Sequence, residues 1–191
     1  MTDDPRDDGY LTGHLLVAMP QMLDERFVKT VIYMCAHTED GAMGLVVNKI
    51  LEDIDFPDLL DQLDLSPSSG GDDIRVHFGG PVESGRGFVL HSSDYHQEAT
   101  MVIDEQIALT ATTDILRDIA EGDGPQSSLL ALGYAGWGPG QLDSEIQANG
   151  WLSVDADPGL IFGAEPDKVW QGALAKIGID VSMLSGDAGH A

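Results

Sequence analysis

Short apolar runs, interleaved irregularly with a few helix-like segments, are the feature that most restricts the fold of this chain. Residues 14–19 (HLLVAM) and 30–36 (TVIYMCA) are rich in the branched and aromatic residues that favour β-strands. An Asp40-Gly41 pair follows the second run and residues 43–48 (MGLVVN) return, which is a β-hairpin signal. A doubly wound parallel sheet needs an even alternation of strands and helices, which this pattern lacks. We therefore predict an α+β fold with a mixed, mainly antiparallel sheet.

The remaining elements follow from hydrophobic periodicity and from helix-end signals. Further strands are expected at residues 74–78, 87–91, 100–103, 107–110, 129–134, 151–154 and 160–162. Helices are expected at residues 56–65, 113–120, 139–149 and 167–177. In the third helix, Pro139 would occupy the first position and Gly150 would lie just past the end, as these residue types favour.

Composition indicates a folded domain with an acidic surface. The 191 residues are 42% hydrophobic, and 9 Lys and Arg stand against 33 Asp and Glu, giving a formal net charge of −24. We expect an acidic disordered tail at residues 1–9 and a single domain at residues 10–191, because the Ser/Gly/Asp-rich loop at 66–73 is short for a linker. The charge is interpreted either as a solubilising coat or as an adaptation to salty surroundings, where ions screen the repulsion.

The same charge limits partners and location. Nucleic-acid binding needs Lys and Arg to neutralise phosphates, so we expect no direct binding to DNA and no membrane partner. The first eight residues lack the basic and apolar regions of a signal peptide. The longest apolar stretches are shorter than the roughly 18 residues of a membrane span, and a single cysteine, Cys35, precludes an intrachain disulfide. These features predict a cytoplasmic protein.

A search for chemistry-bearing motifs is negative. The sequence has no P-loop, no nucleophile elbow, no dinucleotide-binding glycine pattern and no HExxH zinc motif. We therefore predict no catalytic residue, no metal and no cofactor. Cys35, within a predicted buried strand, is interpreted as a core residue rather than a nucleophile. His37, at the end of that strand, either caps the turn or pairs with Glu39 or Asp40 in a functional role.

Two glycine-rich segments are the candidate ligand sites. The first spans residues 78–88 and the second residues 132–141, which are predicted to form a strand, a glycine-rich turn and a helix start. Such a turn presents backbone N–H groups and the positive end of a helix dipole to an anion or carboxylate. The candidate ligand-binding residues are Gly79, Gly80, Arg86, Gly133, Tyr134, Gly136, Trp137 and Gln141.

A structural interpretation of the same residues stays open. The glycines would then permit tight turns and close packing of the backbone, and Trp137 would be a core aromatic. Asp143 and Glu145 lie in the first turns of the predicted helix, where their charge would compete with a bound anion.

The longest motifs resemble the bacterial YqgE/AlgH family. ALGYAGWGPGQLDSEIQANGWL (131–152) resembles the family signature, and the resemblance continues through residues 14–49, FGGPV (78–82), GFVLHSSD (87–94) and the ending 167–191. The resemblance implies a soluble α+β protein whose mixed, mainly antiparallel bifurcated sheet is curled into a pseudo-barrel with flanking helices. It implies no agreed catalytic or ligand residues, and its name carries a suggested role in transcriptional regulation.

Function is therefore predicted at a general level. The first hypothesis is a non-enzymatic regulatory or interaction protein, whose transcriptional role would be indirect, through a protein partner or a sensed ligand. The alternative is a small-molecule binding protein for an anion or carboxylate, or an unrecognised enzyme, that uses the 133–141 turn. This alternative predicts a concave pocket on which Arg86, Tyr134 and Trp137 converge. A third hypothesis is a structural or oligomer-forming module.

Overall fold

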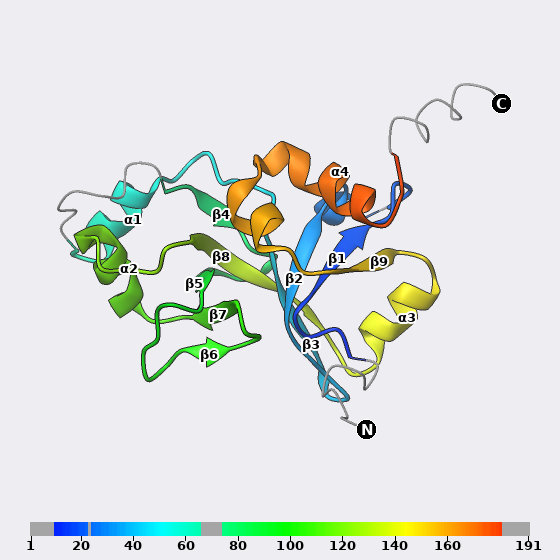
Figure 1. Ribbon diagram of the computed structural model, residues 1–191, viewed down its shortest axis with the longest axis horizontal. Coiled ribbons are helices and arrows are strands. Elements are labelled where there is room, and N and C mark those ends of the chain that lie inside the picture. Colours follow the sequence, from blue (N-terminus) through cyan, green and yellow to red (C-terminus); the bar gives the residue numbers. More distant parts are fainter. Residues whose placement is uncertain (1–9, 23, 66–73, 181–191) are drawn as a thin grey trace.

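A curled β-sheet, divided into two limbs that share one long strand, forms the centre of the molecule (Figure 1). The computed structural model describes residues 10–22, 24–65 and 74–180. Within them the strands are β1 (His14–Ala18), β2 (Val31–Thr38), β3 (Gly41–Val46), β4 (Val76–Phe78), β5 (Val82–Ser92), β6 (Met101–Val102), β7 (Ile107–Thr110), β8 (Ser128–Trp137) and β9 (Trp151–Asp155). Their order is β6-β7-β5-β8-β3-β2-β1-β9, and β4 pairs with β8 outside this path. The β4–β8 pair is parallel, while the other pairs are antiparallel.

Helices cover the sheet at both ends (Figure 1). They are the 3-10 helix η1 (Glu25–Phe27), α1 (Phe56–Gln62), α2 (Thr113–Glu121), α3 (Gln141–Gln147), the π-helix η2 (Gly159–Gly163) and α4 (Pro166–Lys176). Local sequence explains their ends: Asp55 and Asp58 form a capping box at the start of α1, and α2 stops at Gly122 in the left-handed conformation. No helix within the described ranges is both long and apolar enough to cross a membrane.

Three apolar clusters fill the spaces between sheet and helices. The main cluster joins β1, β2, β5, β7 and β8 to the buried face of α4, where Val169, Trp170, Ala173 and Leu174 lie. A second cluster packs Leu142 of α3 against the opposite side of the β1–β2–β3 region and contains Trp137 and Trp151. The third places α1 and α2 against β4, β5 and β8. The helices therefore cover different parts of the sheet.

The sheet divides where the chain after β4 crosses β8 near Gly133. Residues up to Phe78 pair with one side of β8, and Val82 then pairs with Tyr134 on its other side. Beyond the crossing, β3 pairs with the second half of β8, from Ala135 to Trp137. The two backbones approach so closely that a Cβ at Gly133, which has φ of +79°, would lie 2.3 Å from the carbonyl oxygen of Gly80. Glycine is required here because a side chain would clash with Gly80 and because the backbone is left-handed.

The structure confirms the predicted fold class, a mixed, mainly antiparallel bifurcated sheet that is curled and flanked by helices. The 30–48 hairpin is present as β2 and β3, and the 167–177 helix as α4. The acidic tail expected at residues 1–9 and the loop at 66–73 lie outside the described residues.

Three local predictions were wrong. Residues 160–162 lie in the π-helix η2 and not in a strand, because a run of three apolar residues has no periodicity to distinguish the two. Helix α3 begins at Gln141, after Gly140 has adopted a left-handed conformation, so Pro139 precedes the helix. Residues 135–137 continue β8 and do not form a turn, because β3 pairs with them, whereas residues 133–134 lie in the strand as predicted.

Substituting Gly133 by Ala should destabilise the protein by more than about 2 kcal/mol, because the new Cβ combines a left-handed backbone with a clash against Gly80. Urea unfolding followed by circular dichroism measures the change. Gly85→Ala is the matched control, since a Cβ at Gly85 would meet no atom within 4 Å. Equal unfolding midpoints for the two variants would show that the crossing tolerates a side chain.

Candidate functional site

A cavity of about 810 Å³ opens between the two limbs of the sheet. Its walls come from the β2–β3 hairpin, from β5, from β6 and β7, and from the shared strand β8. The lining residues are Ala36, Thr38, Asp40, Gly41, Ala42, Met43, Val82, Arg86, Phe88, Ala99, Met101, Leu109, Ala111, Tyr134, Gly136 and Trp137. The volume lies within the range of about 300–1,000 Å³ that is usual for small-molecule sites.

The cavity continues the main apolar core towards solvent. Four residues of the cavity wall also belong to the main cluster or pack against it. Phe88 and Leu109 are members of the cluster, and Met43 and Tyr134 are partly buried residues that pack against it. The rings of Phe88 and Tyr134 meet edge to face, with centroids 5.9 Å apart. Met101 on the edge strand β6 is 42% exposed and marks the open side. An apolar molecule in the cavity would therefore contact fixed core residues on one side and water on the other.

An irregular stretch of β5 carries Arg86 to the cavity wall. Val82 pairs with Tyr134 and Gly87 with Leu132, so the four residues 83–86 lie opposite the single residue Gly133. This stretch forms a large β-bulge, of the kind that often re-aims a side chain next to a functional site. The Arg86 guanidinium lies 5.2 Å from the centre of the Phe88 ring, and its Nη1 atom is 3.7 Å from Glu83 Oε2.

The structure divides the eight predicted ligand residues into two groups. Arg86, Tyr134, Gly136 and Trp137 line the cavity together. Gly79, Gly80 and Gly133 form the backbone crossing, and Gln141 lies on α3; these four are not among the lining residues. A ligand role for any of the eight stays a prediction.

Part of the predicted anion site at the start of α3 already has protein partners. The Gln141 Oε1 atom accepts a hydrogen bond from the Gly138 backbone N–H at 3.0 Å, and Gln141 Nε2 donates to Glu145 Oε2 at 3.0 Å. The Gln141 side chain thus takes the Gly138 N–H group that an anion at the turn would use.

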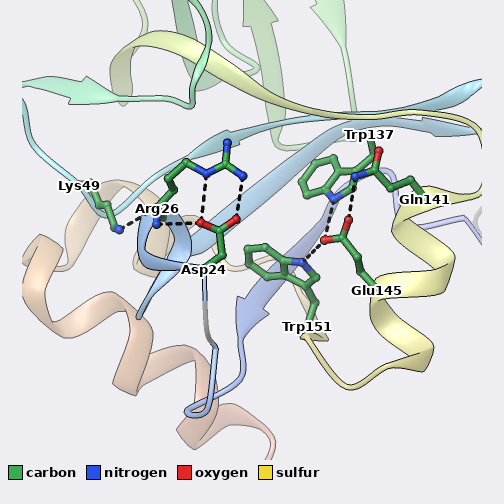
Figure 2. A network of polar contacts seen from close by, with 7 residues as sticks. All are labelled: Asp24, Arg26, Lys49, Trp137, Gln141, Glu145 and Trp151. Carbon is green, nitrogen blue, oxygen red and sulfur yellow. Dashed lines mark hydrogen bonds and ion pairs between the residues drawn. The ribbon is translucent and has the colours of Figure 1, made fainter.

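Trp137 belongs mainly to a network on the other side of the sheet (Figure 2). Alternation along β8 places its ring in the second apolar cluster, while Tyr134 and Gly136 share the opposite face. The indole N–H groups of Trp137 and Trp151 both donate to Glu145 Oε1, at 3.3 and 3.1 Å. Two of the three tryptophans are therefore joined to α3 through one carboxylate, which the sequence does not signal.

A second cavity of about 280 Å³ lies beside η2 and β4. Arg75 and Glu165 line it and form an exposed ion pair with Nη1 3.5 Å from Oε2. His77 also lines it, and its Nδ1 atom is 3.3 Å from the Leu130 carbonyl oxygen. Burial lowers the pKa of His77, which favours the neutral imidazole.

The remaining reactive side chains are held in structural contacts. Burial raises the pKa of Cys35 to about 12, so its thiol is protonated at neutral pH, as the core interpretation expects. His37 is buried: its Nδ1 atom accepts from the Leu11 backbone N–H at 2.9 Å, and Nε2 lies 3.6 Å from Asp143 Oδ1. The ring nitrogens of His37 therefore link the N-terminal segment to α3. Among residues 10–22, 24–65 and 74–180, no group of three His, Cys, Asp or Glu side chains is placed to hold a metal ion.

Most cavity residues were missed by the sequence analysis. Met43, Met101 and Leu109 are ordinary apolar strand residues, and they come from three separate strands, β3, β6 and β7. Their alternation within strands predicts that one face is buried but does not predict that a cavity opens there.

Comparison with known proteins gives one consistent group. A family model described as AlgH-like matches residues 15–182. A UPF0301 protein of Rhodospirillum rubrum is 57% identical over 97% of both chains, and one of Afipia carboxidovorans is 57% identical over 95% of this chain and 90% of its own. The solution structure of the AlgH protein from Pseudomonas aeruginosa has a TM-score of 0.81 and 41% identity, covering 100% of both chains. A Corynebacterium diphtheriae crystal structure shares the fold, with a TM-score of 0.69 at 20% identity over 86% of this chain and 85% of its own.

Replacing Glu145 by Ala should destabilise the protein by about 1–3 kcal/mol, because two largely buried indole N–H groups lose their acceptor. Urea unfolding followed by tryptophan fluorescence measures the loss. Gln147→Ala, on an exposed position of the same helix, is the control and should change stability by less than about 0.5 kcal/mol. A similar effect of both substitutions would contradict the structural role of the carboxylate.

Proposed function

This chain belongs to the AlgH-like family, and we propose that it is a non-enzymatic binding protein whose ligand occupies the cavity between the two sheet limbs. The observation that carries the proposal is the composition of the cavity wall. An 810 Å³ space bounded mainly by apolar side chains, with few polar groups, is the usual form of a small-molecule site.

The side chains that face the cavity favour binding over catalysis. The lining residues with a charged or hydroxyl-bearing side chain are Thr38, Asp40, Arg86 and Tyr134. The Thr38 Oγ1 atom accepts from the Asp40 backbone N–H, and Arg86 is paired with Glu83, so neither contact couples a nucleophile to a base. The buried thiol of Cys35, with its raised pKa, is equally unsuited to nucleophilic attack.

Any regulatory role would act through a ligand or a protein partner. A formal charge of −24 repels the DNA backbone, and nine Lys and Arg offer few phosphate contacts. A binding protein that changes its interactions when the cavity fills would reconcile a regulatory role with this charge. We place this role in the cytoplasm, where the single cysteine would stay reduced.

Gly136→Val tests the cavity directly. A Cβ at this position would approach the Tyr134 ring at 3.3 Å and Val82 at 4.0 Å, so a valine would fill part of the space. The uncharged dye N-phenyl-1-naphthylamine should gain fluorescence saturably with the natural protein and bind on the order of tenfold more weakly to the variant, because the added methyl groups exclude part of the probe.

Ser153→Val provides the control, because it adds the same side chain to an exposed position of β9 outside the cavity wall. Circular dichroism should show both variants folded, and Ser153→Val should bind the dye as the natural protein does. Equal dye binding by all three proteins would refute the cavity as the binding site.

Purified protein should not shift a DNA duplex selectively in a gel at about 0.15 M salt, since its charge opposes the backbone at close range. Selective binding is measured by titrating the protein into a duplex from the promoter region of its own gene and into a scrambled duplex. Tight binding that distinguishes the two duplexes would overturn the indirect role.

A further inference from the structure

We infer that the cavity selects a monocarboxylic acid with an apolar aromatic or alkyl body, and that Arg86 on the β5 bulge binds its carboxylate. This inference rests on the proposed binding function and names the chemical class of its ligand. Among the described residues that line the cavity, Arg86 is the one basic side chain.

The bulge presents the guanidinium at the edge of an aromatic wall. Arg86 lies over the Phe88 ring at 5.2 Å, and Phe88 meets the Tyr134 ring edge to face. The stacking contact limits the movement of a long side chain, so less conformational freedom is lost when a ligand binds. The planar fork of N–H groups matches the two oxygens of a carboxylate.

Glu83 is an internal carboxylate that a ligand can replace. It lies three residues before Arg86 on the same bulge, at 3.7 Å, which exceeds a normal charge-assisted hydrogen bond. The two side chains are 54% and 56% exposed, so their ion pair is weak and exchanges readily. In the described part of the chain, no hydrogen bond holds the Arg86 guanidinium, and its donors are available to an incoming acid.

The remaining wall specifies the rest of the ligand. Met43, Leu109 and Tyr134 continue the apolar core and would cover a hydrocarbon or aromatic body. Asp40, at the tip of the β2–β3 hairpin, is the other charged residue of the wall and would repel a second acid group. A single carboxylate therefore fits better than a dicarboxylate.

Three compounds of one shape separate charge from apolar contact: 4-phenylbutyrate, 4-phenylbutan-1-ol and 4-phenylbutylamine. Nuclear magnetic resonance titration of the full chain gives each dissociation constant and locates the shifted amides. The acid should bind on the order of tenfold more tightly than the alcohol, since a charge-assisted contact is added, and the amine most weakly. Adding a second carboxylate at the far end of the acid should weaken binding.

Two substitutions on the bulge should act in opposite directions. Arg86→Gln should remove the preference for the acid while leaving the affinity for the alcohol unchanged. Glu83→Gln should tighten binding of the acid, because the competing carboxylate is gone, which a merely structural role of the bulge would not produce. Arg117→Gln is the matched control, since Arg117 is a similarly exposed arginine paired with Asp114 three residues earlier.

The outcomes distinguish the two proposals. If neither the dye nor any of the three compounds binds at the cavity, or if Gly136→Val leaves every affinity unchanged, both the binding function and the ligand class fail. If the dye binds and none of the three compounds shifts the cavity amides, the ligand class alone fails. If acid and alcohol bind equally, or if Arg117→Gln weakens acid binding as much as Arg86→Gln, the cavity remains a binding site and the carboxylate class is overturned. If the amine binds most tightly, Asp40 and not Arg86 determines the charge of the ligand, and the carboxylate class is again overturned.

Discussion

The architecture depends on the contact of two backbones where the segment after β4 passes over β8. A Cβ at Gly79 would lie 2.2 Å from the Gly133 carbonyl oxygen, and one at Gly80 would lie 2.0 Å from the Tyr134 carbonyl carbon. Side chains are thus excluded from both partners of the crossing, which explains why glycine occurs on each. Since the chain changes sides here, the first half of β8 can pair with β4 and the second half with β3.

The crossing also determines where a ligand site can form. Once the chain has passed over β8, it must rejoin the sheet at Val82, and the four residues from Glu83 to Arg86 are accommodated opposite one glycine. The bulge that carries Arg86 is therefore a consequence of the same geometry that divides the sheet. The two limbs diverge from β8, and the space between them is lined by strands of both limbs. A structural role for some glycines and a ligand role for their neighbours are compatible.

Sequence reasoning succeeded where a pattern was local and periodic. The 30–48 hairpin, the amphipathic face of α4 and the resemblance of whole blocks to a known family led to the correct fold class. It was wrong at 135–137, where glycines were interpreted as a turn, because pairing with the distant strand β3 leaves no local signal in the sequence. The convergence of Arg86, Tyr134 and Trp137 on one pocket was predicted, and all three line the cavity, but the Trp137 ring lies mainly in the second apolar cluster. The apolar wall and the attachment of two tryptophans to Glu145 depend on tertiary contacts.

The large negative charge and the chemistry of the cavity act over different distances. Acidic side chains elsewhere on the surface set the long-range potential, which opposes a polyanion such as DNA over many contacts. At about 0.15 M salt, exposed charges are screened beyond about 8 Å. The charge of the small ligand that the protein prefers therefore depends on the groups that touch the ligand. In the cavity wall these are Arg86 and Asp40, with Glu83 beside the arginine. An acidic protein can therefore exclude nucleic acid and still bind one carboxylate, provided that a guanidinium is held where Glu83 alone competes for it.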